Sequence, residues 1–192
     1  MPDLDWVNSV YLSEAGLSAA HTAFQQHGYV QLREFLKPEI FGKLQKLIRK
    51  SSWRQQYLPD VVKCSLAQCQ KKIWKLLFSS DFRVFVEVIT GFKSKRPLLS
   101  LCRFSHGDYS LLNDKVASKK GIMFELEFSA KWNHSSGGFT SVLREGSEIV
   151  RVCPQQNTLT LVNSDKNTQS FVKYVTHKAG MRKRVFIQGM LV

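Results

Sequence analysis

The carboxy-terminal half of the sequence is a series of short apolar or alternating runs, each bounded by residues that favour turns. Side chains along a strand point alternately to its two faces, so this texture predicts strands. Gly107, Gly137-Gly138 and Pro154 are among the residues that separate the runs. The predicted strands are 98–104, 109–112, 122–128, 139–143, 148–152, 158–162, 170–176 and 184–191. A succession of about eight short strands is typical of a β-sandwich or an antiparallel jelly roll.

The first half of the chain is predicted to be mainly helical. Ser13 is a favourable N-cap, Gly28 a favourable helix end, and Pro38 suits the first turn of a second helix. The predicted elements are helices over 14–28, 39–50, 66–78 and 81–90, a strand over 29–32 and a loop over 51–65. The loop is predicted because Trp53, Tyr57 and Pro59 leave that segment without a regular period.

These elements suit one domain, because 192 residues can bury a single core of ordinary size. The basic connector 93–97 separates a helical lead-in, 1–92, from a strand-rich part, 93–192. We therefore predict an α+β fold in which an antiparallel jelly roll, or double-stranded β-helix, carries the N-terminal helices packed along one of its sheets.

The formal net charge of +13 favours an acidic partner such as RNA, a ribosome or an acidic protein. The simpler interpretation is that scattered lysines keep the protein soluble. Two clusters favour a partner over scatter. The first is Lys43, Lys46, Arg49 and Lys50, which read mainly as the solvated face of a helix, and the second is Lys173, Lys178, Arg182, Lys183 and Arg184. The second cluster is the predicted surface for an acidic partner.

The four cysteines form neither a Cys-x-x-Cys metal pattern nor a dense disulfide framework. Cys102 lies in an apolar run and is predicted to be a small buried hydrophobic residue. The sequence has no apolar run of about 18 residues, so no membrane span is expected. The acidic amino terminus lacks the apolar centre of a signal peptide. We expect a reduced protein of the cytoplasm or nucleus.

Five segments, taken together and in this order, are distinctive: 34–39, 103–111, 137–141, 157–162 and 171–177. They resemble one family, the eukaryotic ribosomal-protein prolyl 3-hydroxylases, which include fungal oxygen-sensing and translation-termination members. The resemblance is greatest to the second, carboxy-terminal jelly roll of that family, and it extends from about Trp6 to the end of the chain.

The resemblance implies a division of labour between two jelly rolls. In that family the first jelly roll binds iron(II) and 2-oxoglutarate and hydroxylates a proline of a small-subunit ribosomal protein. The second has lost the metal site and supports structure, substrate docking or regulation. This chain is accordingly expected to be a degenerate jelly roll without cofactor of its own, whose partner is a catalytic jelly roll, a ribosomal protein or a regulator.

The resemblance also allows the metal site to be compared residue by residue. It places Asn113 at the first histidine of the iron site, Lys115 at the acid, and Phe171-Val172 at the second histidine. A lysine there would bring a positive charge against a cation. Arg184 matches the position that grips the far carboxylate of 2-oxoglutarate. We therefore expect no catalytic, cofactor-binding or metal-binding residues, and interpret Arg184 as surface charge.

Two alternatives remain open. His106-Gly107-Asp108 has the literal pattern His-x-Asp, and His177 lies downstream, so these three could form the site of an active iron(II) and 2-oxoglutarate dioxygenase. Against this, the triplet lies in a turn, for which Gly107 is suited. The other alternative is a basic RNA- or ribosome-binding module, with aromatic residues that neighbour cations at Trp53-Arg54, Trp74-Lys75 and Lys173-Tyr174.

Overall fold

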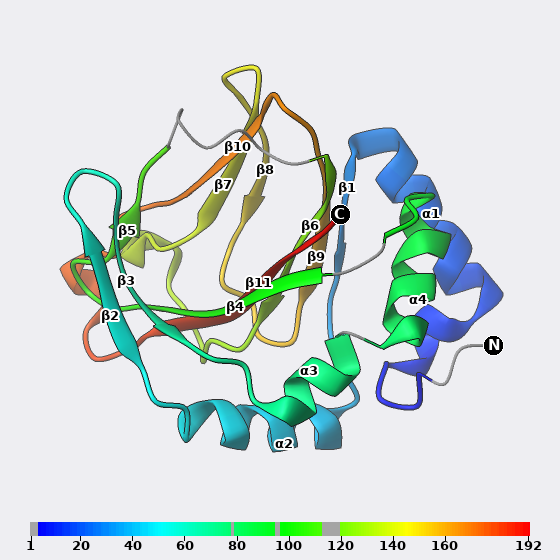
Figure 1. Cartoon of the computed structure of the whole chain (residues 1–192), viewed down its shortest axis with the longest axis horizontal. Helices are drawn as coiled ribbons and strands as arrows, with labels where there is room; N and C mark the ends of the chain where they lie inside the picture. The colour runs from blue at the N-terminus through cyan, green and yellow to red at the C-terminus, as the bar shows by residue number, and fades with distance from the viewer. Residues whose placement is uncertain (1–3, 78, 95–96, 113–119) are drawn as a thin grey trace.

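The computed structural model describes residues 4–77, 79–94, 97–112 and 120–192. Its centre is an eleven-stranded sheet that curls into a nearly closed barrel, and four helices lie around its outside, two at the right and two at the bottom of Figure 1. Every strand pairing among the described residues is antiparallel. The predicted α+β jelly roll is therefore confirmed.

Hydrogen-bonded neighbours follow the order β1-β9-β6-β11-β4-β3-β5-β10-β7-β8, and β2 pairs with β3 outside this path. All eight strands predicted after residue 97 are present. Their bounds shift by no more than two residues, except that the strand predicted over 170–176 already ends at Val172. In chain order the strands are β1 (Tyr29–Leu32), β2 (Arg54–Leu58), β3 (Val62–Ala67), β4 (Pro97–Phe104), β5 (Tyr109–Ser110), β6 (Gly121–Glu127), β7 (Thr140–Arg144), β8 (Ser147–Val152), β9 (Leu159–Ser164), β10 (Thr168–Val172) and β11 (Arg184–Leu191).

The residues predicted to cap the first helix lie at its two ends. The Ser13 hydroxyl accepts a hydrogen bond from the Gly16 N–H at 3.1 Å, and Gly28 ends the first helix with φ of 72°. The helices are α1 (Glu14–His27), α2 (Pro38–Arg49), α3 (Lys71–Leu77) and α4 (Ser80–Thr90), with shorter 3-10 turns η1 (Ser9–Leu12), η2 (His134–Ser136) and η3 (His177–Ala179). Within the described ranges no helix is long and apolar enough to cross a membrane.

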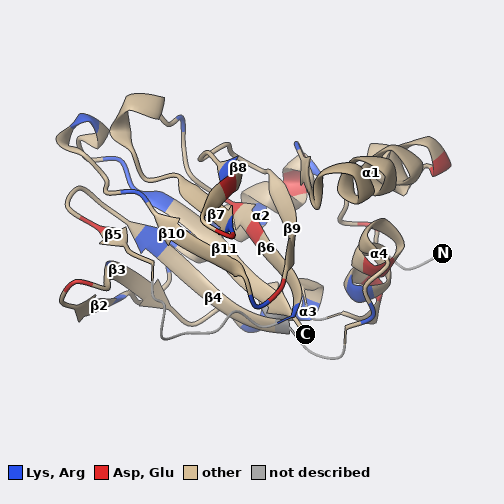
Figure 2. Ribbon diagram, turned by 90° about the horizontal axis from the view of Figure 1, so that it is seen from above, with Lys and Arg blue, Asp and Glu red and all other residues tan. Residues whose placement is uncertain are grey.

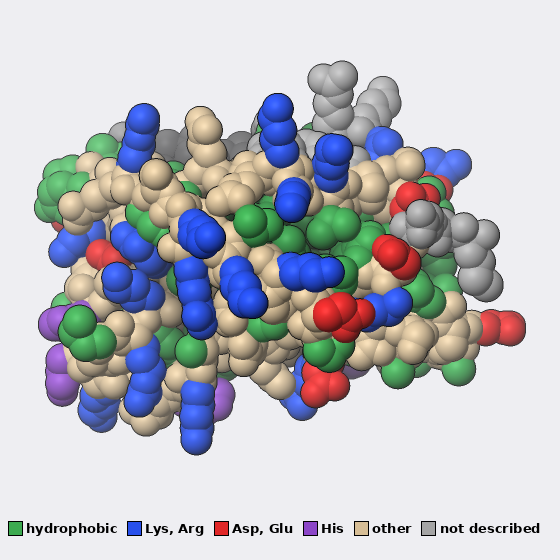
Figure 3. All heavy atoms as spheres, turned by 90° about the horizontal axis from the view of Figure 1, so that it is seen from below, with side chains coloured by type: hydrophobic (Ala, Val, Ile, Leu, Met, Phe, Trp, Pro, Cys, Tyr) green, Lys and Arg blue, Asp and Glu red, His purple; other side chains and the backbone are tan. Residues whose placement is uncertain are grey.

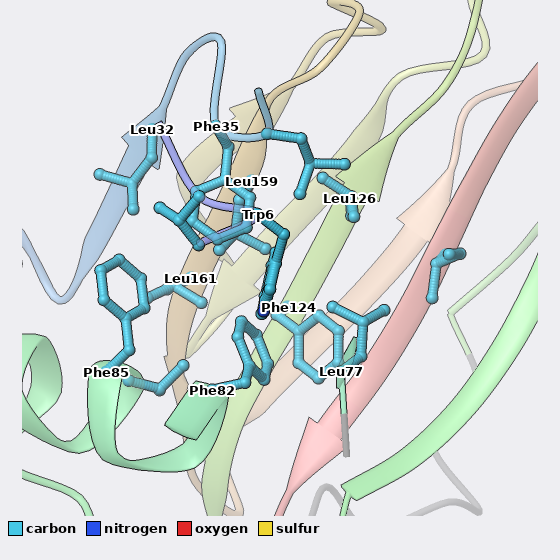
Figure 4. Packing of buried hydrophobic residues seen from close by; sticks show 14 of the residues in the cluster. Trp6, Leu32, Phe35, Leu77, Phe82, Phe85, Phe124, Leu126, Leu159 and Leu161 are labelled. Atoms are coloured by element: carbon cyan, nitrogen blue, oxygen red, sulfur yellow. The ribbon is translucent and has the colours of Figure 1, made fainter. Parts of the chain in front are cut away.

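The helices pack on the outer face of the sheet formed by β1, β9, β6, β11 and β4. Phe82 of α4 meets Phe124 of β6 with ring centroids 5.6 Å apart, and Trp6 and Phe35 join the same cluster (Figure 4). These aromatic side chains pack with many buried aliphatic ones in the hydrophobic core between the two layers. Seen from above, α1 and α4 stand at one end of the molecule, away from β2, β3 and β5 (Figure 2). The expectation that the helices cover one sheet is confirmed.

The predicted loop over 51–65 is wrong, because that segment contains the hairpin of β2 and β3. All five residues of β2 are exposed, so its sequence shows no alternation of buried and exposed positions. The helix predicted over 66–78 begins only at Lys71, because Leu66 and Ala67 complete β3 and pair with β4. The lead-in therefore contributes strands, as well as helices, to the barrel.

Candidate functional site

A buried ion cluster occupies the inside of the barrel where β11 begins. The Arg184 guanidinium donates from Nε to Glu127 Oε2 at 3.0 Å and from Nη2 to Glu125 Oε2 at 2.8 Å. Its Nη1 donates to Thr140 Oγ1 at 2.7 Å. All four side chains are at most 2% exposed. Arg184 is thus held by groups of the protein on each of its three nitrogens.

Strand alternation places these groups inside the barrel. On β6, Phe124 and Leu126 belong to the core beneath the helices, so Glu125 and Glu127 point to the other face. Thr140 comes from β7, which belongs to the opposite part of the barrel wall. The cluster therefore links β7, through side chains, to the paired strands β6 and β11.

Further hydrogen bonds satisfy the carboxylates. Thr140 Oγ1 donates to Glu125 Oε1 at 2.8 Å, and Ser129 donates to Glu127 Oε1 from its hydroxyl at 2.5 Å and from its backbone N–H at 3.1 Å. The Arg184 guanidinium also lies 4.1 Å from the centroid of the Phe186 ring. Each carboxylate oxygen of the two glutamates therefore has a protein donor, as buried charges require.

Burial and ion pairing shift the pKa values of Glu125 and Arg184 in opposite directions. Burial raises the pKa of Glu125, although Arg184 and the hydrogen bond from Thr140 oppose the rise. Burial alone lowers the pKa of Arg184, but Glu127 and Glu125 outweigh it and raise that pKa above its usual value. The raised pKa keeps the arginine protonated, and burial makes the Glu125 carboxyl harder to ionise than an exposed glutamate.

Arg184 was predicted to lie on a basic surface, and this is wrong, because its side chain is fully buried. It begins β11 and faces inward, whereas Arg182 and Lys183 precede the strand and are exposed. Lys173 and Lys178 are also exposed. The other four residues of the predicted surface are thus accessible to solvent.

The apparent His-x-Asp motif is a turn. The Asp108 carboxylate, 6% exposed, accepts a hydrogen bond from the Ser105 N–H at 2.8 Å. Gly107 has φ of 86° and donates its N–H to the Val175 carbonyl at 2.9 Å. His106 and His177 are exposed. Across the described segments, no group of three His, Cys, Asp or Glu side chains is arranged to hold a metal ion.

The position matched to the second iron histidine is apolar. Val172, 6% exposed, packs in a cluster with Cys64, Cys102, Phe104 and Phe186. Asn113 and Lys115, the other two positions matched to iron ligands, lie outside the described residues.

Three of the four cysteines, Cys64, Cys69 and Cys102, are buried and act as small hydrophobic residues. Burial raises the pKa of Cys64 to about 11 and that of Cys69 to about 11, and it raises the pKa of Cys102 further. The prediction for Cys102, which is 5% exposed, is confirmed.

Sequence reasoning missed Glu125, Glu127, Thr140 and Ser129. The available signal was the pair of glutamates at alternate positions of an otherwise apolar strand. Two carboxylates on the inward face of a buried strand require a cation, and the first residue of a paired strand is a place to look for one.

Solved structures with a similar fold show the structural class of the chain. A prolyl 4-hydroxylase from Pseudomonas putida superposes with a TM-score of 0.71 and 15% sequence identity, over 91% of this chain and 97% of that one. A prolyl hydroxylase from Trichoplax adhaerens, solved with a hypoxia inducible factor peptide fragment, has a TM-score of 0.73 and 12% identity, over 95% and 91%. The chain has the jelly-roll fold of 2-oxoglutarate and iron(II) oxygenases.

The sequence narrows the class to a family. Residues 60–189, more than half of the chain, match the family described as oxoglutarate and iron-dependent oxygenase degradation C-term, and the chain belongs to that family. This bears out the resemblance to the carboxy-terminal jelly roll of prolyl 3-hydroxylases.

Curated relatives agree with the family. Prolyl 3-hydroxylase OGFOD1 of Xenopus laevis is 24% identical over 228 residues, which cover 93% of this chain and 44% of that protein. Prolyl 3,4-dihydroxylase OGFOD1 of Ostreococcus tauri is 26% identical over 233 residues, which cover 91% and 45%. The chain spans about half the length of the curated relatives that it matches.

Proposed function

We propose that this chain is a non-catalytic jelly-roll domain that serves structure, substrate docking or regulation in a prolyl hydroxylase system linked to translation. One observation carries the proposal. Arg184, matched by resemblance to the arginine that grips 2-oxoglutarate, already binds the carboxylates of Glu125 and Glu127 inside the barrel.

The described residues do not fit iron and 2-oxoglutarate. A carboxylate ligand would have to displace a glutamate from Arg184 and leave that glutamate buried without its cation, which is costly. Val172 offers no ligand atom at the position matched to the second histidine. We therefore derive no chemical step through either group.

The test is a titration of the purified chain with manganese(II) or iron(II) and 2-oxoglutarate, followed by an assay for succinate release with a proline peptide. We expect neither stoichiometric metal binding nor turnover, whereas a catalytic relative run in parallel should show both. Metal binding that His106→Ala or Asp108→Ala abolishes would make the turn an active site and overturn the proposal. The control variant is His134→Ala, which removes another exposed histidine of the described chain.

The proposed docking role uses an acidic partner, such as a ribosomal assembly. Lys173, Lys178, Arg182 and Lys183 are exposed on or near η3. Changing Lys173, Lys178 and Lys183 to Glu should weaken co-sedimentation with ribosomes by roughly tenfold or more and flatten its salt dependence, because charge reversal removes long-range attraction. The melting temperature should stay nearly unchanged. Unchanged co-sedimentation would show that these cations only keep the protein soluble.

A further inference from the structure

The hairpin of β2 and β3 borders a polar, open groove. The groove has a volume of about 950 Å³ and lies between the end of α2, β2, the segment after β3 and β4. Its lining consists mainly of serine and glutamine side chains, with Lys50 and Arg54 as its cations. A second hollow of about 430 Å³ is lined by Gln55, Tyr57, Lys63, Gly107 and Tyr109.

Gln55 lines both hollows, so the two hollows adjoin at β2. We call this surface the β2 strip and define it by Lys50, Arg54, Gln55, Tyr57, Lys63 and Tyr109. Every residue of β2 is exposed, and the strand pairs only with β3 within the described chain. The β2 part of the strip is therefore open to a ligand, and Lys63 and Tyr109 beside it are half-buried.

The cations of the strip have no acidic partner in the part of the chain that the structure describes. Lys50, Arg54 and Lys63 form no ion pair with any residue that the structure describes. Exposed cations of the neighbouring helices extend the positive surface: Lys43, Lys46 and Arg49 on α2, and Lys71, Lys72 and Lys75 on α3. On the face that carries α2, Lys and Arg side chains are widely spread, and most acidic ones gather toward α1 and α4 (Figure 3). The surface attracts a polyanion.

Two tyrosines lie among these cations. Tyr57 is 62% exposed and has no ring contact with another described residue. Tyr109 is half-buried and lines the same hollow. An exposed aromatic side chain beside cations is the arrangement on which successive bases of a single strand stack.

We propose that the β2 strip binds single-stranded RNA. Lys50, Arg54 and Lys63 contact phosphates, while Tyr57 and Tyr109 stack on bases. The serine and glutamine side chains of the groove both donate and accept hydrogen bonds, which suits the 2′-hydroxyl of ribose as well as base edges. The proposal does not rest on the absence of catalysis, because no residue of the strip belongs to the buried cluster around Arg184.

An acidic peptide is the competing ligand. It would neutralise the same cations, and its backbone could pair with the open edge of β2. It would, however, leave the exposed ring of Tyr57 without a stacking partner. The combination of unpaired cations, amide side chains and an exposed ring therefore favours RNA over a peptide.

The test is fluorescence anisotropy with a labelled oligouridine of about twelve nucleotides, within the site sizes known for single-strand binders. Changing Lys50, Arg54 and Lys63 together to Gln should weaken binding at least tenfold and reduce the slope of log affinity against log salt by about 2, roughly 0.7 for each phosphate contact. Tyr57→Ala should weaken binding roughly fivefold or more at an unchanged salt slope, and Tyr57→Phe should restore it.

The control replaces three exposed cations in turns or bends elsewhere in the chain, Arg33, Lys131 and Lys166, by Gln. It removes the same charge and should change affinity less than threefold, roughly the effect of long-range charge alone. Equal weakening by both triple variants would show that only net charge matters and would overturn the strip. Equal affinity for DNA of the same sequence, or full competition by a polyglutamate peptide, would overturn the choice of RNA. Matching melting temperatures establish that all variants are folded.

Discussion

Two arginine–glutamate pairs have the same length but lie in opposite surroundings. Arg184 Nε is 3.0 Å from Glu127 Oε2 inside the barrel, and the two side chains are 0% and 2% exposed. Arg151 Nε is also 3.0 Å from Glu148 Oε1, on the outer strand β8, and these side chains are 53% and 34% exposed. Distance therefore does not distinguish the two pairs, whereas burial does.

This difference in solvent exposure indicates that the stability of the fold depends on the inner pair. If one partner of the outer pair is lost, the other partner returns to water at little cost. If one partner of the inner pair is lost, the remaining charge cannot reach water. It then has neither hydration nor the attraction of its partner, which destabilises the folded state. The same reasoning separates the cations that hold the barrel from those of the β2 strip, which remain available to a ligand.

The largest expected effect is that of Arg184→Ala. It leaves Glu125 and Glu127 buried without their cation, and we expect the free energy of unfolding to fall by about 3–5 kcal/mol. Urea unfolding followed by circular dichroism measures this loss. Arg182→Ala removes an exposed arginine two residues away and should change stability by no more than about 0.5 kcal/mol. Similar losses of unfolding free energy in the two variants would contradict this prediction, because burial would then not determine how much an arginine contributes to stability.

A smaller effect, with a definite sign, is expected from Glu125→Gln. Burial raises the folded-state pKa of Glu125, so its contribution to stability is present below its ordinary pKa and is lost as pH rises through the raised value. The glutamine does not titrate. The variant should therefore gain stability relative to the wild type as pH rises from about 4 to 8, the range in which burial shifts carboxyl groups.

Urea unfolding of both proteins across that pH range measures the difference. If the wild type instead becomes more stable relative to Glu125→Gln as pH rises, the attraction of Arg184 exceeds the cost of burying the Glu125 carboxylate. Glu148→Gln provides the opposite sign, because the hydrogen bonds from Ser141 and Arg151 lower the pKa of Glu148.

The sequence predicts those parts of the fold that have a periodic pattern. Strands β6, β9 and β11 have buried apolar residues on at least one face, and the helices begin and end at Ser13, Gly28 and Pro38. The hairpin of β2 and β3 escaped prediction because β2 is exposed on both faces and is held by backbone hydrogen bonds. Periodicity reports burial, so it cannot detect a strand that buries neither face.

The candidate site was harder to predict, because its members are far apart in sequence. Arg182, Lys183 and Arg184 are consecutive cations, yet only the third enters a strand and turns inward. Its partners lie 57 and 59 residues away. Local sequence gave no reason to separate Arg184 from its neighbours until the pairing of β11 with β6 brought the charges together.

The smallest expected effect is that of Glu148→Gln on the outer pair. The change removes the charge but keeps an oxygen that can accept the hydrogen bond from the Ser141 hydroxyl, which is 2.7 Å long. Because both partners reach water, the loss should be no more than about 1 kcal/mol at low salt. About 1 M sodium chloride should reduce this loss further by screening.

The stability that the pair provides is present above the ordinary pKa of glutamate and is lost as pH falls, since the folded-state pKa of Glu148 is lowered. Urea unfolding at two salt concentrations, and at pH 7 and about 3, measures all three effects. A loss as large as that of Arg184→Ala would mean that contact geometry outweighs burial in setting the energy of these pairs.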